Sequence, residues 1–197
     1  YNQFAVRYNY ITPSWFYAIP ELSVRTINTF YDQDTKEGLG LSASDDLEKS
    51  VVVPQFTFAT GVTFEKDGKY LQSISPRAFY AYSPYKKQDD HPNFDSTTAS
   101  ISYDQLFNPY RFYGHDRLED NNFLSLGVTY SILDTEGLER IRASLGQSYY
   151  FNDRRVTLNE EPDEFDTQKR TGPIISLASQ LNQNFTLAAN SAWMSNG

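Results

Sequence analysis

Apolar side chains alternate with small or polar ones along much of this chain, and that period of two residues constrains its fold more than any other feature. Over residues 56–64 the large apolar side chains fall on one face of an extended chain and the small ones on the other. Residues 124–132 and 141–149 repeat the pattern. Such alternation is typical of a β-strand whose two faces meet different media. Weaker versions occupy residues 3–11, 15–31, 69–84, 171–181 and 184–195. We therefore predict about eight strands.

The connections between these strands alternate in length. Short ones fall near residues 12–14, 66–68, 134–137 and 182–184, and long ones occupy 33–49, 85–119 and 153–170. Asp67-Gly68 is a strong hairpin signal, because glycine tolerates the positive φ of a tight turn. In an antiparallel up-and-down sheet this order puts every tight turn on one edge and every long loop on the other. Outer-membrane barrels have this asymmetry.

Composition narrows the classes of protein that fit. The net charge of −8 argues against a general surface for nucleic acid or anionic lipid. An aromatic content of 16% is far too high for a disordered chain. There is no cysteine, so no disulfide and no thiolate metal site. No apolar run reaches the ~18–20 residues of a membrane helix, but a membrane strand needs only ~9–11 residues with one apolar face.

Most charged residues fall in the long loops, and the few within strands lie on the faces opposite the apolar sets. These strand residues are Arg7, Glu21, Arg25, Arg77, Arg140 and Arg142. A charge facing lipid at mid-depth costs about 2–4 kcal/mol, so a polar lumen is the expected surrounding. Glu21 is the nearest same-face partner for Arg25, and Arg140 and Arg142 are expected to share a face. A soluble, half-exposed sheet has the same alternation, but it explains less well the cluster Trp15-Phe16-Tyr17 beside a tight turn, where an interfacial aromatic girdle is expected.

The predicted fold class is therefore all-β: an antiparallel up-and-down transmembrane β-barrel segment, with about eight strands of a larger barrel. Residues 1–197 are expected to form part of a single outer-membrane β-barrel domain. The segment 103–119 is too rich in large apolar groups for a solvated loop, so we expect it to be ordered and to fold inward. Its candidates for partner contact are Phe107, Tyr113, Asp116 and Arg117.

Residues that suggest enzymatic chemistry are few. His91 and His115 lie in the second long loop, where Ser96, Ser100, Asp95 and Asp116 could complete a hydrolase-like site. Loop histidines beside proline or glycine are more often surface residues, and we predict no enzyme and no catalytic residue. Acidic clusters at 45–46, 89–90 and 160–164 could hold divalent cations, but solvated loop charge is the favoured interpretation. No metal and no cofactor is expected.

Three stretches of the sequence resemble one family. They are Ile74-Ser75-Pro76-Arg77-Ala78-Phe79-Tyr80-Ala81-Tyr82-Ser83-Pro84-Tyr85, then Asn93-Phe94-Asp95-Ser96 with Leu106-Phe107 through Tyr113-Gly114-His115-Asp116-Arg117-Leu118, and Ser144-Leu145-Gly146-Gln147-Ser148-Tyr149-Tyr150-Phe151. In order and spacing, over about residues 52–152, they resemble the LptD family of lipopolysaccharide-assembly proteins. His115 departs from the pattern, because a second glycine is expected there.

The resemblance implies a protein of the Gram-negative cell outer membrane with a periplasmic domain and a very large barrel, plugged by the lipoprotein LptE. Such a protein releases lipopolysaccharide into the outer leaflet through a gap between the first and last barrel strands. This chain would be a middle segment of that barrel. Its partners would be LptE in the lumen, lipopolysaccharide, outer-membrane lipid and the barrel-assembly machinery, with no nucleic acid.

Two alternatives stay open at this point. A self-contained eight-stranded outer-membrane barrel, either an adhesin or a small lipid-modifying enzyme, fits the strand count. Its interior would be filled by side chains, and the small inward residues expected here, such as Gly61, Gly127 and Gly146, would leave it underfilled. A soluble β-sandwich or carbohydrate-binding module is the other alternative.

Overall fold

The computed structural model of this chain describes residues 1–197 apart from 31–47, 89–90, 92, 159–163, 183 and 194–197. Its strands are β1 (Asn2–Arg7), β2 (Tyr10–Ile11), β3 (Phe16–Phe30), β4 (Glu48–Val62), β5 (Phe64–Lys66), β6 (Leu71–Ser83), β7 (Thr97–Thr98), β8 (Phe112–Tyr113), β9 (Asn121–Leu133), β10 (Glu139–Tyr150), β11 (Ile174–Gln180) and β12 (Thr186–Ala192). A 3₁₀ helix, η1, spans Gln105–Phe107, and a short helix, α2, spans Glu164–Thr167.

The long strands form one antiparallel sheet in the order β1-β3-β4-β6-β9-β10-β11-β12, with β2 extending the edge beside β3 and β5 pairing with β6. This meander confirms the prediction of eight sequential strands, of which two are interrupted. The first expected strand is divided into β1 and β2, and the stretch 56–64 belongs to a strand that already begins at Glu48 and breaks before β5. Glu48 and Lys49, assigned to a loop from the sequence, are therefore strand residues, and residues 33–47 lie outside the described part.

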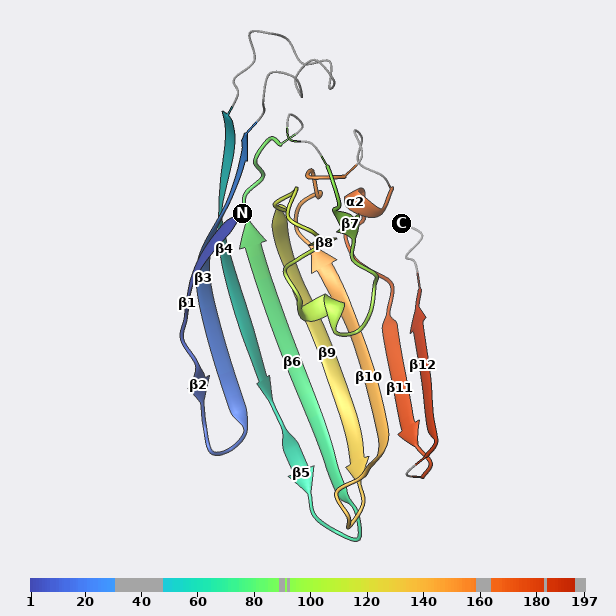
Figure 1. Cartoon of the computed structure of the whole chain (residues 1–197). Coiled ribbons are helices and arrows are strands. Elements are labelled where there is room, and N and C mark those ends of the chain that lie inside the picture. The colour runs from blue at the N-terminus through green and yellow to red at the C-terminus, as the bar shows by residue number, and fades with distance from the viewer. Residues whose placement is uncertain (31–47, 89–90, 92, 159–163, 183, 194–197) are drawn as a thin grey trace.

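The tight turns lie together at one end of the sheet and the long connections at the other (Figure 1). The hairpins β2–β3, β5–β6, β9–β10 and β11–β12 close toward the lower end of the view, while the described parts of the segments 84–120 and 151–173 leave the sheet at its upper end, the former reaching down over the middle of the sheet. The predicted alternation of short and long connections is thus confirmed for the described residues. Among the described strands, β1 and β12 stand at opposite ends of the order and do not pair with each other.

The register separates the sheet into two chemically different faces. One, here called the outer face, carries large apolar side chains that are exposed, including Leu22, Val24, Ile74, Tyr82, Leu126, Leu145 and Leu177. The other, the inner face, carries small and polar side chains: Ser125 is fully buried, and Ser23, Ser131, Ser144 and Ser148 are nearly so. Alternation along each strand places neighbours on opposite faces, as the sequence predicts.

Apolar clusters on the inner face are completed by the segment 84–120. Ile27, Val51 and Val53 of β3 and β4 pack with Leu118. Phe79, Ala81 and Phe123 pack with Phe107, and Tyr103 and Leu106 pack with Ile174. The core thus lies between the sheet and its own second long loop. No helix among the described residues is both long and apolar enough to cross a membrane.

Candidate functional site

The segment 99–119 lies across the inner face, and glycines on the sheet create the space for it. A Cβ at Gly127 of β9 would lie 2.7 Å from Cζ of Phe107, and one at Gly146 of β10 would lie 2.7 Å from Cδ1 of Leu106. Neither distance is tolerable between nonbonded carbons. The Ser125 hydroxyl donates to the carbonyl oxygen of Leu106 and so joins η1 to the sheet. The prediction that 103–119 is ordered and folds inward is confirmed.

Arg77 fastens the same segment from β6. Its guanidinium carbon lies 3.5 Å from the ring centroid of Phe107 and 4.5 Å from that of Tyr103, so the cation is in contact with both rings. Nη2 also lies 3.2 Å from Oδ1 of Asp104, but that carboxylate is almost fully exposed, so solvent weakens the ion pair. The aromatic contacts, worth about 0.5–2 kcal/mol for each cation–π pair, are the stronger attachment.

Arg25 forms a buried ion pair with Glu119, at the end of the same segment. Nη1 donates to Oε1 over 2.6 Å, and both side chains are 2% exposed. Burial raises the pKa of Glu119, and the Arg25 charge opposes that shift. Glu21, expected to be the partner of Arg25, instead lies opposite Arg7 in the register and is bonded to it over 2.5 Å. The expected pairing of Arg25 with Glu21 was wrong, because Glu119, at the end of the second long loop, contacts the Arg25 guanidinium instead.

A β-bulge in β10 changes the surroundings of the last two charged strand residues. Glu139 and Ile141 pair with consecutive residues of β9, so Arg140 has no register partner. Arg140 donates to Oδ2 of Asp134 in the tight turn and to backbone carbonyls at the end of β11. Arg142 pairs with Ser131 in the register and donates to both carboxylate oxygens of Glu139. Arg142 therefore lies on the inner face, whereas Arg140 belongs to the turn edge of the sheet.

Asp116 organises the loop around residues 93–96. Its Oδ2 accepts hydrogen bonds from the backbone N–H groups of Phe94, Asp95 and Ser96 and from the Ser96 hydroxyl. Partial burial alone would raise the pKa of Asp116, but the bonds from Asp95, Phe94 and Ser96 outweigh it and lower that pKa. Asp116 therefore holds a loop together.

Ser96, Asp95 and Asp116 lie together in this loop, whereas the two histidines contact other side chains. The His115 ring packs against Tyr1 at a tilt, with 4.4 Å between centroids, and Nδ1 of His91 lies 3.1 Å from the Thr29 hydroxyl. The Ser96–Asp116 pair closes a turn. Among the described residues there is no group of three or more side chains able to hold a metal ion. The acidic clusters 45–46, 89–90 and 160–163 lie outside the described residues.

Tyr113 is more accessible than Phe107 and Arg117. Tyr113 is 58% exposed, whereas Phe107 is partly buried against the sheet and Arg117 is of intermediate exposure. Arg117 Nη1 donates to the carbonyl oxygen of Asp116, and Arg117 lines a cavity of about 340 Å³ together with Tyr113 and Arg25. Of these three candidates in the segment, Tyr113 offers the most surface to a partner.

The part of the inner face nearer the tight turns is left open and is polar. Hydroxyl groups pair across it: Thr63 with Ser75, and Ser73 with Ser131, at 2.9 and 2.8 Å. A cavity of about 380 Å³ lies here, lined by these residues together with Arg77, Thr129, Arg142 and Ser144. We call it the hydroxyl-lined cavity.

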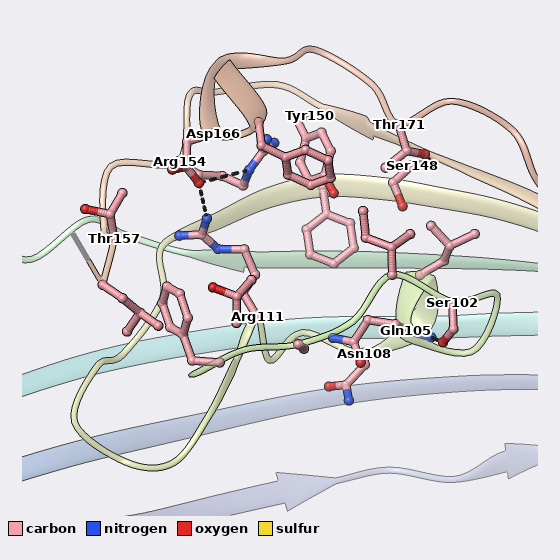
Figure 2. A pocket seen from close by; sticks show the side chains of 18 residues that line it. Ser102, Gln105, Asn108, Arg111, Ser148, Tyr150, Arg154, Thr157, Asp166 and Thr171 are labelled. Atoms are coloured by element: carbon pink, nitrogen blue, oxygen red, sulfur yellow. Dashed lines mark hydrogen bonds and ion pairs between the residues drawn. The ribbon is translucent and has the colours of Figure 1, made fainter. Parts of the chain in front are cut away.

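One cluster was not expected from the sequence, because its members come from separate loops. Arg111 donates to Oδ1 of Asp166 over 2.8 Å and lies 3.4 Å from Oδ1 of Asp120, while Arg154 lies 4.0 Å from Asp166 (Figure 2). Burial lowers the pKa of Arg154. The Asp120 carboxylate also accepts hydrogen bonds from the backbone N–H groups of Arg155 and Val156. The cluster joins the second and third long loops above the inner face.

An antiparallel meander with an apolar outer face, a polar inner face, tight turns on one edge and long loops on the other defines the class: a segment of an outer-membrane β-barrel. A profile described as "LptD: LPS transport system D" matches residues 2–196. The chain belongs to the LptD family.

Similar proteins of this family come from several bacteria. The chain is 73% identical to the LPS-assembly protein LptD of Acinetobacter baumannii and 69% identical to that of Acinetobacter baylyi, in each case over its whole length. It is 36% identical to the LptD of Psychrobacter cryohalolentis over 93% of its length. It spans 24% of the length of each Acinetobacter relative. The family match along the chain does not favour the alternative of a self-contained eight-stranded barrel.

Proposed function

We propose that this chain forms part of the wall of a barrel that transports lipopolysaccharide and inserts it into the outer leaflet of the Gram-negative outer membrane. The observation that carries the proposal is the identity of about 70% to proteins named for lipopolysaccharide assembly, along the whole chain. The two-faced sheet supports it, since lipid-exposed apolar side chains alternate with polar ones directed inward. Residues 1–197 would then be part of a single outer-membrane β-barrel domain.

The inner face would line a lumen that holds the lipoprotein LptE. Arg25 and Arg77 are engaged within the chain, by Glu119 and by the rings of segment 99–119. Their role in this proposal is to hold that segment in place as a cap. The side chains left for a partner are the half-exposed Arg142, the exposed Arg7 and the hydroxyl-lined cavity. Tyr113 adds an exposed aromatic ring at the rim of the cap.

The role is transport, with no covalent chemistry. Insertion of the protein into the outer membrane would depend on the barrel-assembly machinery, because the backbone groups of barrel strands must be paired before they meet lipid. Lipopolysaccharide would be the cargo, and outer-membrane lipid would contact the outer face.

Complementation tests this function. The full-length protein containing this chain is produced in cells depleted of their own LptD, and lipopolysaccharide at the cell surface is quantified by accessibility to a surface-acting modifying enzyme. We expect the unmodified protein to restore surface lipopolysaccharide. Phe107→Ala, which removes the ring between Arg77 and Gly127, should reduce barrel assembly, while Tyr113→Ala should leave assembly intact and weaken LptE co-purification. Failure of the unmodified, correctly assembled protein to restore surface lipopolysaccharide would contradict the proposal.

A further inference from the structure

A third cavity lies between the segment 98–112 and the described residues of 154–171, at the long-loop end of the inner face (Figure 2). Its volume of about 410 Å³ is within the ~300–1,000 Å³ range of small-molecule sites. The Arg111–Asp166–Arg154 cluster borders it on one side (Figure 2). It shares no lining residue with the hydroxyl-lined cavity.

Most of the wall is apolar. Leu106, Phe112 and Phe123 are buried side chains that line it, and further apolar groups come from both loops. These further groups are Ala99, Ile101, Leu158 and Phe165. Such a wall suits a hydrocarbon chain, since each methylene group is stabilised on leaving water for apolar surroundings.

The polar end of the cavity is built from two arginines with spare donors. Arg154 is 4% exposed, and its Nη2 has no hydrogen-bond partner among the described residues; the same holds for Nε of Arg111. A buried donor without an acceptor destabilises the folded state, and a charged donor does so more strongly. The arrangement is therefore incomplete without an acceptor supplied from elsewhere.

The free arginine donors indicate what kind of acceptor fits. Arg111, Arg154 and Asp166 are the charged residues of the lining. Asp120, which is not part of the lining, contacts Arg111 at 3.4 Å, so the two arginines are accompanied by two carboxylates and it is their unpaired donors that remain. An arginine with free donors in a water-poor site favours a carboxylate or phosphate oxygen, which forms charge-assisted hydrogen bonds.

We propose that this cavity binds an anionic amphiphile: a hydrocarbon chain that lies among the apolar side chains and carries a carboxylate or phosphate group against Arg111 and Arg154. The inference goes beyond transport, because it assigns a separate resting site for a lipid-like ligand between the second and third long loops. A ligand bound there would join the two loops and accept hydrogen bonds from the free donors of Arg111 and Arg154.

Photo-crosslinking tests the site in the full-length protein, reconstituted in nanodiscs of neutral choline lipid. Three probes with a photoreactive group in the chain are compared: a fatty acid, a phosphatidic acid and a phosphatidylcholine. We expect the fatty acid, the phosphatidic acid or both to form adducts with peptides of 98–112 or 154–171, and the comparison identifies the head group. The choline probe should label mainly outer-face peptides. No adduct of either anionic probe in these segments would overturn the proposal.

Two variants sharpen the result. Arg154→Met should reduce anionic labelling of the cavity about tenfold or more, since it removes a charged hydrogen bond. Ile101→Trp should abolish labelling by filling the cavity, while Ile175→Trp on the outer face serves as the matched control. Assembly is checked by heat-modifiable electrophoretic mobility. Undiminished cavity labelling in assembled Ile101→Trp overturns the proposal even if Arg154→Met does not assemble.

Discussion

Gly127 shows what a single residue contributes to the cap. Because a Cβ there would lie 2.7 Å from Phe107 and 2.9 Å from the Tyr103 hydroxyl, Gly127→Val should displace segment 99–119 from the sheet. We expect the free energy of unfolding to fall by about 1–3 kcal/mol and proteolysis between residues 99 and 119 to become faster. Limited proteolysis of the full-length protein, with fragments mapped by mass spectrometry, measures it. Gly68→Ala is the control, because the nearest atom to its added Cβ is 3.7 Å away; equal protection of both variants would contradict the packing described.

The Arg25–Glu119 pair lets the cost of an unpaired buried charge be measured. Arg25→Met leaves Glu119 buried without its cation, so it should destabilise by about 3–5 kcal/mol. The double variant Arg25→Met/Glu119→Met should be more stable than the single one, since no unpaired charge remains. Denaturant unfolding of the full-length protein in detergent provides the comparison. A double variant less stable than Arg25→Met would show that the pair is not an isolated ion pair.

Asp116 makes the loop around 93–96 sensitive to acid. Its pKa in the folded protein is below the ordinary value of 3.8, so the stabilisation it provides is complete above that value and is lost as the pH falls through the lower, folded pKa. The backbone amides of residues 94–96 should therefore lose protection against hydrogen exchange below about pH 4. This loss should exceed the intrinsic pH dependence of the exchange rate. Asp116→Asn should not show this acid-dependent change. If both proteins lost protection at the same pH, a group other than Asp116 would be responsible for the change.

The orientation of a side chain could be predicted from the sequence only where it follows from the alternation within a single strand. The outward direction of Leu124 and Leu126 follows from alternation alone. The partner of Arg25 does not, because Glu119 is 94 residues away and reaches it through a loop whose path depends on the glycines beneath it. The Arg111–Asp166 contact is hidden for the same reason: it joins two loops that have no periodic pattern.

At the scale of elements, the strands and their connections were predictable because both have local signals. Period two identifies the strands, and Asp67-Gly68 marks a turn. The bulge between Glu139 and Ile141 has no such signal: it adds one residue to β10 and is visible only in the pairing with β9. The sequence indicated that segment 103–119 is buried, through its apolar content, but not that Gly127 and Gly146 receive it.

The topology predicts a simple difference in labelling. In intact cells producing the full-length protein, a cysteine at Asp67 or Glu136, in two tight turns, should be shielded from a membrane-impermeant maleimide. A cysteine at Lys169, in the third long connection, should react. All three should react after the outer membrane is permeabilised, which controls for reactivity. Labelling of the turn positions in intact cells would place the tight turns and the long loops on the same side of the membrane. That result would contradict this topology.

For the whole molecule, we propose that the inner face of this sheet meets the cargo and its partner while the outer face meets lipid. Tyr130 and Ser131 test it within one strand, because they are neighbours on opposite faces of β9: Tyr130 is 37% exposed, and Ser131 borders the hydroxyl-lined cavity. A photo-crosslinking amino acid is placed at each position of the full-length protein in living cells. We predict adducts with the lipoprotein or with lipopolysaccharide from position 131 and neither from position 130; the reverse pattern, or equal adducts from both, would contradict the account.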